Sequence, residues 1–95
     1  MARTPLSEEK VREAMAALPQ WTANGVASIE RQIEFGNHLA ALGFVVQVAA
    51  IAETLDHHPE VNWVYNRVRF ILSTHDAEGI TKRDFELASR IDGLL

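Results

Sequence analysis

Apolar residues recur at helical spacing close to the start of the chain. The i, i+3, i+4, i+7 pattern of an amphipathic helix is met by Val11, Ala14, Met15 and Leu18. Ser7 precedes this run, and acidic Glu8 and Glu9 fall in its first turn, where the positive end of the helix dipole favours them. We therefore predict a helix that Pro19 ends.

A period of two follows this helix. Asn24-Gly25 readily supplies the positive backbone angles of a tight hairpin turn. Beyond it, apolar and polar residues alternate from Ala27 to Phe35, which is typical of a half-buried strand. Arg31 interrupts the apolar face once. Together with the residues after Trp21, the pattern predicts a first hairpin.

The stretch from His38 to about Leu55 has helical length and is apolar on nearly all sides. Its most apolar part, Leu39 to Ala52, is fourteen residues long, is interrupted only by Gln47, and falls short of the roughly 20 residues that cross a bilayer. We therefore expect a buried helix and no membrane span. So short a chain can hardly cover such a helix alone, and self-association is the simplest remedy. We expect a homo-oligomer.

The next segments repeat the strand pattern. Proline disfavours the helical conformation in the residue before it, so Asp56-His57-His58-Pro59 should stop the apolar helix. Val61 to Tyr65 and Val68 to Thr74 are rich in β-branched and aromatic residues. They are separated by Asn66-Arg67, which predicts a second hairpin.

A final helix closes the chain. Thr81, three residues before Asp84, resembles a capping box with Asp in place of Glu or Gln. The residues of this helix that should face inward are Phe85, Leu87, Ala88, Ile91 and Leu94. The order α-β-β-α-β-β-α predicts an α+β fold, a four-stranded antiparallel sheet with three helices on one face, in a single domain spanning residues 1–95.

Composition excludes several kinds of site and binding partner. At 95 residues, with 47% hydrophobic and 23% charged positions, the chain suits one globular domain. The absence of cysteine excludes a disulfide framework and a thiolate zinc site. A formal charge of -4 gives no basic footprint, so we expect no direct binding of nucleic acid. The amino terminus lacks the apolar segment of a secretory signal, which predicts a cytoplasmic protein.

Three of the four histidines fall in the second half of the chain. His57 and His58 follow the apolar helix and His75 ends a strand, so the three could converge at one rim of the sheet. The acidic residues that accompany them are Glu53, Asp56 and Asp84. A carboxylate beside an imidazole fixes its tautomer and favours its protonated form.

Such a cluster suits proton transfer. The ordinary pKa of histidine, about 6.5, lets imidazoles donate and accept protons near neutrality. Elimination of water needs one group to protonate the departing hydroxyl and another to remove a proton from the adjacent nitrogen. Two imidazoles in opposite protonation states suffice, so we expect neither a metal nor a cofactor.

The same residues also allow other interpretations. An HHP triplet after a helix suits a polar loop, Asp84 suits a helix cap, and Glu53 suits a solvated helix position. Trp63 and Tyr65 suit ordinary sheet positions, since aromatic side chains favour pleated surfaces. His38 has no evident partner, so we expect it at the surface.

A zinc site is a further alternative. Three imidazoles and one carboxylate make an acceptable ligand set for zinc. Adjacent side chains such as those of His57 and His58 usually point in different directions, which makes joint chelation awkward.

These residues resemble the signature of the pterin-4a-carbinolamine dehydratase family. In that signature a Glu and three intervening residues lead to His-His-Pro, followed by an aromatic residue, a His and a later Asp. The matching residues are Glu53, His57, His58, Pro59, Tyr65, His75 and Asp84. The similarity extends through AETLDHHPE, VYNRV, LSTH and TKRDFELASRID, and covers most of the chain from about Phe35 onward.

The resemblance implies a four-stranded antiparallel sheet with three helices on one side, assembled as a homodimer or homotetramer. It also implies a reaction, the removal of water from 4a-hydroxytetrahydrobiopterin. That compound is left by a pterin-dependent aromatic amino acid hydroxylase, and the product, quinonoid dihydropterin, is ready for recycling. Some relatives also bind a homeodomain transcription factor and stabilise its dimer, so a protein-binding module is the second hypothesis.

By the same resemblance His57, His58 and His75 line the pterin site. His57 and His75 are then the acid and base, in unassigned order, and His58 binds the substrate. The residues expected to orient these groups or to bind substrate are Glu53, Asp56, Pro59, Trp63 and Asp84. The chain has Val61 where many members have an aromatic residue, and Trp63 where Asn is common. These departures bear on ring stacking and substrate preference more than on the reaction type.

Overall fold

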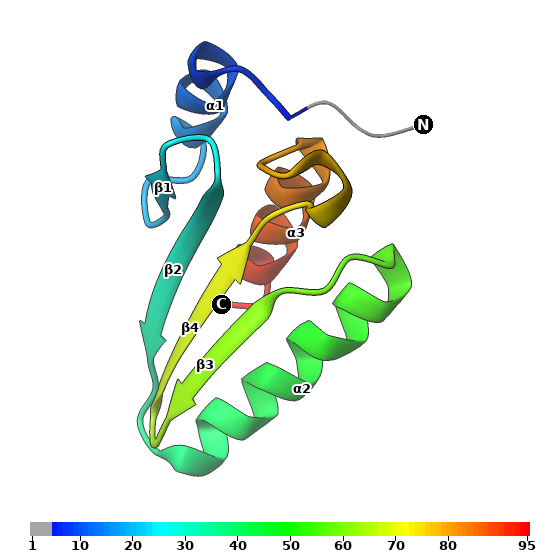
Figure 1. Ribbon diagram of the computed structural model, residues 1–95. Coiled ribbons are helices and arrows are strands. Elements are labelled where there is room, and N and C mark those ends of the chain that lie inside the picture. Colours follow the sequence, from blue (N-terminus) through cyan, green and yellow to red (C-terminus); the bar gives the residue numbers. More distant parts are fainter. Residues whose placement is uncertain (1–4) are drawn as a thin grey trace.

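The order of helices and strands agrees with the sequence pattern. The computed structural model describes residues 5–95, so residues 1–4 of the predicted domain lie outside it. The elements are α1 (Glu8–Met15), β1 (Thr22–Asn24), β2 (Ser28–Glu34), α2 (His38–Leu55), β3 (Glu60–Val64), β4 (Arg67–Leu72), the 3-10 turn η1 (His75–Ala77) and α3 (Lys82–Gly93) (Figure 1). The predicted order α-β-β-α-β-β-α is confirmed, and η1 is an addition to it.

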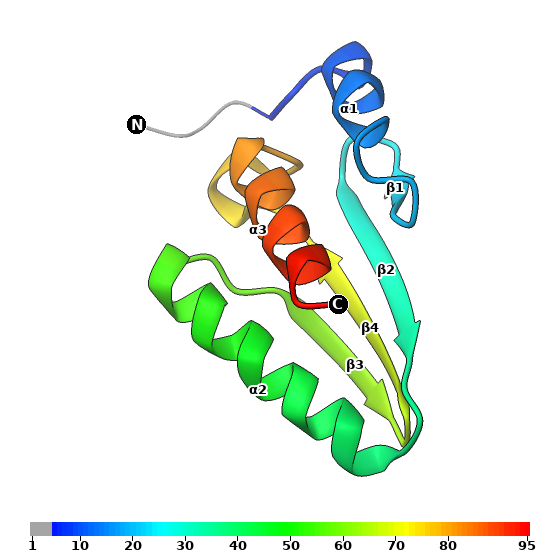
Figure 2. The same ribbon diagram turned by 180° about the vertical axis from the view of Figure 1, so that it is seen from behind.

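The four strands form one antiparallel sheet in the order β1-β2-β4-β3. The two hairpins thus lie side by side, with β2 and β4 at the centre and β1 and β3 at the edges. The first hairpin turns at Asn24-Gly25, as predicted, where Gly25 has a φ of 57°. Figure 1 and, from behind, Figure 2 show α2 and α3 on the same face of the sheet. The predicted α+β fold is confirmed.

Alternate residues of the central strands form the core. The buried apolar residues of β2 and β4 are Ile29, Ile33, Val68, Phe70 and Leu72. The helix residues in the same cluster include Phe44, Val48, Leu87, Ala88 and Ile91. Because successive side chains of a strand point to opposite faces, only the face under the helices is apolar.

Arg31, which interrupts the apolar face of β2, has a partner on α3. Its Nη1 donates to Oδ1 of Asp92 at 2.7 Å, and the indole Nε1 of Trp21 donates to the same oxygen at 2.9 Å. The Asp92 carboxylate therefore links α3 by hydrogen bonds to β2, through Arg31, and to the residue before β1, Trp21. This contact explains why a cation stands on an otherwise apolar strand face.

Several boundaries differ from the prediction. β4 ends at Leu72, two residues before the predicted Thr74, so His75 begins η1 and does not end a strand. α1 ends at Met15 instead of reaching Pro19, because the following N–H groups bond to carbonyls three residues back and tighten the chain. The second hairpin turns at Tyr65-Asn66, one residue earlier than predicted, so Arg67 belongs to β4. The Asn66 side chain donates to the Phe35 carbonyl at 2.8 Å. Because this contact joins residues far apart in the sequence, the local pattern of apolar and polar residues does not reveal it.

α2 is apolar on two opposite sides. The side that faces the core holds Ala41, Phe44, Val48 and Ala52. The opposite side, which we call the outer stripe, consists of Leu39, Leu42, Val46 and Ala49, and it is exposed in the single chain. By length and composition this 18-residue helix could also cross a membrane, with 22% of it buried. The predicted bounds, His38 to about Leu55, are confirmed, but the helix is not buried as expected, because the outer stripe is exposed in the single chain.

Candidate active site

The chain leaves α2 through a sharp turn at Asp56. This residue has the left-handed conformation (φ 51°, ψ 45°), and its N–H bonds to the Glu53 carbonyl. The N–H of His57 bonds to the Ala52 carbonyl at 3.0 Å, which completes a Schellman motif. Glycine is usual at the left-handed position, and aspartate is among the few other residues that adopt it readily. The turn sends His57 into the fold and leaves His58 exposed.

His57 is buried against the start of α3. Its side chain is 8% exposed, and its Nε2 lies 2.5 Å from Oδ1 of Asp84, a residue with no exposure. The other Asp84 oxygen accepts hydrogen bonds from the Thr74 hydroxyl and the Thr81 backbone N–H, both at 2.9 Å. Asp84 and Thr81 also form the capping box of α3. One carboxylate thus caps the helix with one oxygen and contacts His57 with the other.

His58 has its own carboxylate partner at the surface. Its Nε2 lies 2.6 Å from Oε1 of Glu53, which stands one helical turn earlier on α2. The side chains of His58 and Glu53 are 54% and 79% exposed. Solvent screens such a pair, so it contributes little to stability and both groups can move.

His75 comes from a different part of the fold. It begins η1, directly after Thr74, and its side chain is exposed. Thr74 and Gly79 pair their backbones across this loop, with Thr74 N–H donating to Gly79 O at 2.9 Å. A Cβ on Gly79 would lie 2.7 Å from the Val26 carbonyl oxygen, so the close approach of these two segments requires glycine. The loop that presents His75 is therefore closed on itself and fixed to the first hairpin.

The three histidines line one pocket, as predicted from the sequence. The pocket has a volume of about 210 Å³ and is lined by Asp56, His57, His58, Ser73, Thr74, His75, Asp76 and Arg83. Four of these residues were not singled out from the sequence, namely Ser73, Thr74, Asp76 and Arg83. Each is next to a predicted site residue or belongs to a run, LSTH or TKRDFELASRID, that carries the family resemblance.

The structure does not bring every predicted site residue to this pocket. Glu53 reaches it only through His58, and Pro59 does not line it. Trp63 lies in β3, where its ring stacks on His38 with the ring centres 4.7 Å apart. His38 is exposed, as expected, but it does have partners, because its Nδ1 also lies 2.9 Å from the Tyr65 carbonyl oxygen. Trp63 and His38 therefore form a separate cluster where α2 begins.

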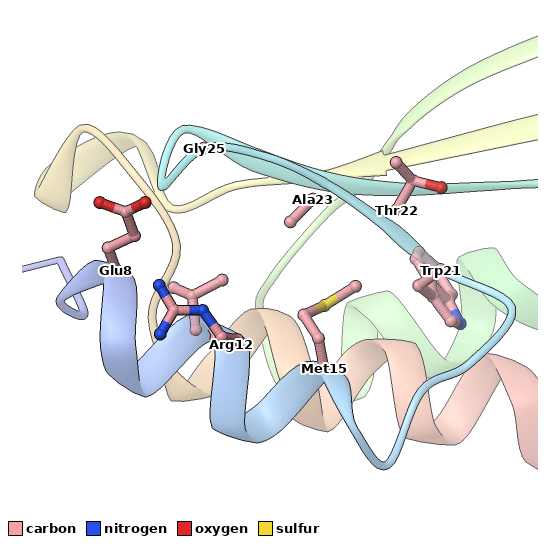
Figure 3. A pocket seen from close by; sticks show the side chains of 8 residues that line it. Glu8, Arg12, Met15, Trp21, Thr22, Ala23 and Gly25 are labelled. Atoms are coloured by element: carbon pink, nitrogen blue, oxygen red, sulfur yellow. The ribbon is translucent and has the colours of Figure 1, made fainter.

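A wider pocket lies between α1 and β1 (Figure 3). Its volume is about 420 Å³, and its lining includes Glu8, Arg12, Met15 and Trp21. It contains one carboxylate and one guanidinium but no histidine, so it lacks a group suited to proton exchange near neutrality. Its size alone does not make it the better candidate.

The geometry also bears on the zinc alternative. Within residues 5–95, no three His, Asp or Glu side chains gather closely enough to hold a metal ion. His57 and His58 each face a separate carboxylate instead of a common centre.

The chain also resembles known proteins over almost its whole length. The family model described as pterin 4 alpha carbinolamine dehydratase matches residues 4–94. The chain belongs to this family. A relative from Acidobacterium capsulatum is 46% identical over 90 residues, which cover 95% of this chain and 97% of that protein. Another, from Chloroflexus aggregans, is 45% identical over 95 residues, covering 100% of this chain and 99% of that protein. Both carry the provisional name pterin-4-alpha-carbinolamine dehydratase.

Two solved structures also resemble this chain. A crystal structure from Brucella melitensis, described as a transcriptional coactivator/pterin dehydratase, superposes with a TM-score of 0.90 at 38% identity. The match covers 96% of this chain and 98% of that one. A pterin dehydratase-like protein, described as a RuBisCO assembly factor in the alpha-carboxysome, gives a TM-score of 0.68 at 22% identity over 79% of this chain and 88% of that one. At that identity the second match reports on the fold alone.

Proposed function

We propose that this protein removes water from 4a-hydroxytetrahydrobiopterin and gives quinonoid dihydropterin for recycling. The observation that carries the proposal is the meeting of His57, His58 and His75 in one pocket, on a chain of the dehydratase family. At about 210 Å³ the pocket is smaller than most ligand sites, which begin near about 300 Å³. A bicyclic pterin bound there would leave part of its surface in solvent in the single chain.

The reaction needs two proton transfers and no redox change. The bond between carbon 4a and its hydroxyl breaks as an acid protonates the leaving oxygen, and water departs. A base takes the proton of the adjacent ring nitrogen, and the electron pair of that N–H bond forms the new carbon–nitrogen double bond. The proton delivered and the proton removed balance, so the histidines return to their starting states after exchange with solvent.

We assign the acid and base roles to His57 and His75. Asp84 occupies Nε2 of His57, so Nδ1 is the ring nitrogen that would exchange a proton with substrate. His75 is exposed and can recover its proton state from water. His58 keeps Nε2 on Glu53, which suits a role in binding the substrate.

The dehydration assay tests this proposal. His57→Ala and His75→Ala should each slow enzymatic loss of the 4a-hydroxypterin absorbance by about 100-fold or more, because each removes a general acid or base. His38→Ala is the matched control, since His38 is a histidine that does not line the pocket, and it should retain activity. A wild-type protein that leaves the spontaneous rate unchanged would contradict the proposal.

We further propose that the outer stripe of α2 packs against a second copy of the chain. Leu39 and Val46 are 73% and 58% exposed, and burying one such side chain stabilises an interface by about 1.5–3 kcal/mol. No charged residue lies between Gly36 and Ala52, so the stripe can be covered without burying a charge.

Sedimentation equilibrium tests whether a second copy of the chain covers this stripe. Val46→Glu should reduce the mass to the 10.6 kDa of one chain, whereas Gln47→Glu, at a neighbouring exposed position, should leave the oligomer intact. A wild-type protein that sediments as a monomer would contradict the proposal. So would flotation of the wild-type protein with phosphatidylcholine vesicles, because a bilayer would then be the partner.

A protein-binding function is the second candidate. The Brucella melitensis structure at 38% identity is described as a transcriptional coactivator as well as a pterin dehydratase. The same outer stripe could receive an amphipathic helix of another protein in place of a second copy. Under this function alone, the protein would bind its partner and show no dehydratase activity.

A further inference from the structure

Arg83 connects the start of α3 with the end of α2. It is the second residue of α3, and its Nη2 donates to the carbonyl oxygens of Leu55 at 3.0 Å and Asp56 at 2.5 Å. The last carbonyls of a helix have no partner within the helix. Arg83 satisfies two such acceptors at the turn from which His57 and His58 emerge.

This contact and the His57–Asp84 contact join the same two segments. Asp84 follows Arg83 in the first turn of α3, and His57 follows Asp56 in the turn after α2. The segments are thus joined twice in parallel, once through the backbone of the turn and once through the imidazole ring. Both contacts therefore depend on how the end of α2 lies against the start of α3.

We infer that Arg83 is a positioning residue for His57 and His58, acting through the backbone of the Leu55–Asp56 turn. The inference rests on the proposed dehydratase function and adds a residue to it. The turn holds Asp56 in the left-handed region, and the carbonyl of Asp56 is one of the two acceptors that Arg83 contacts. A guanidinium can hold two acceptors from a rigid planar group, whereas the lysine ammonium ends a flexible stem.

Three variants test this role in the dehydration assay. Arg83→Gln should lower kcat by about 10- to 100-fold and change KM by less than about 3-fold, because misplacing a catalytic group by about 1 Å can cost that much. Arg83→Lys should lie between it and the wild type, since an ammonium can still reach one carbonyl. Lys82→Gln is the matched control, because it removes the same charge from the exposed neighbouring position, and it should keep the wild-type kcat.

A second measurement does not depend on activity. In protein labelled with nitrogen-15 histidine, the Nε2 resonance of His57 reports how the ring contacts Asp84. Arg83→Gln should shift or broaden this resonance, and Lys82→Gln should leave it in place. If the wild type proved inactive as a dehydratase, this comparison would still decide whether Arg83 positions His57.

Two results would overturn the inference. If Arg83→Gln raised KM by 10-fold or more at unchanged kcat, Arg83 would bind substrate instead of positioning the histidines. If Arg83→Gln lowered only the melting temperature, with kcat and the His57 resonance unchanged, its role would be structural. Should Arg83→Gln fail to fold, Arg83→Lys in the same two measurements gives the decision.

Discussion

Two neighbouring histidines have carboxylate partners in opposite surroundings. The His57–Asp84 pair is almost completely buried, at 8% and 0% exposure, and the His58–Glu53 pair is 54% and 79% exposed. The contact distances are nearly equal, 2.5 and 2.6 Å. Distance therefore does not separate the two pairs, and burial does.

The difference in burial indicates which imidazole is held in place and which can move. Asp84 has further hydrogen bonds from Thr74 and Thr81, and within residues 5–95 no buried side-chain nitrogen or oxygen lacks a partner. A fully satisfied buried network holds one geometry. Glu53 stands in solvent, where the pair competes with water and salt. A preorganised group beside an adaptable one suits a site that must both react and bind.

The largest effect should follow from breaking the buried pair. Asp84→Ala should lower the free energy of unfolding by about 3–5 kcal/mol, because it removes one partner of a buried charged contact and the cap of α3. Glu53→Ala should change it by less than about 1 kcal/mol. Urea denaturation followed by circular dichroism measures both. Equal losses in the two variants would show that burial does not distinguish the pairs.

Removal of one neighbour of Asp84 should have a smaller effect. Thr74→Val keeps the shape of the side chain but removes the hydroxyl that donates to Asp84 and contacts Thr81. We expect a loss of about 1–3 kcal/mol, since buried acceptors are left with fewer donors. Ser73→Val serves as the control, because Ser73 is partly exposed and has no such contacts among residues 5–95. A Thr74→Val protein as stable as the wild type would contradict the described network.

The turn between the two pairs allows a gain in stability. Asp56→Gly should raise the free energy of unfolding by up to about 1 kcal/mol, because glycine adopts the left-handed conformation without the cost that other residues carry. Thermal unfolding measures the gain, with Asp76→Gly as the control at another exposed aspartate of the pocket. A destabilised Asp56→Gly protein would mean that the aspartate side chain itself stabilises this turn.

The smallest effect should come from the exposed pair. Glu53→Gln should change stability by less than about 0.5 kcal/mol, because a solvated pair contributes little. Salt gives an independent measurement. Raising the ionic strength from 0.1 to 1 M, where screening shortens to about 3 Å, should shift the His58 side-chain resonances but not those of His57. Equal shifts in both histidines would contradict the assigned burial.

The fold could be predicted because its signals are local. Periodicity, turn residues and capping residues together indicated the seven main elements, and the predicted order is the observed one. Boundaries that moved depend on contacts outside the pattern, as at Asn66, whose side chain bonds to Phe35. Periodicity indicates which residues face the core, whereas the exact end of an element depends on which distant group satisfies its backbone.

The site was only partly predictable for a related reason. Histidines are visible in a sequence because their chemistry is distinctive, and all three meet in the pocket. Arg83 and Thr74 act on a distant carbonyl and a buried carboxylate, which no local pattern reveals. Trp63 was expected near the pterin, but β3 carries it away from the pocket at about 3.3 Å per residue.

The contact between Arg31 and Asp92 has a consequence for redesign. A designer who replaced Arg31 with isoleucine, to make β2 conform to ideal alternation, would leave the Asp92 carboxylate with the Trp21 indole as its remaining side-chain donor among residues 5–95. The variant would have a more regular sequence and a less stable fold. The irregular position in the strand is therefore half of a matched pair, and the two residues have to be exchanged together.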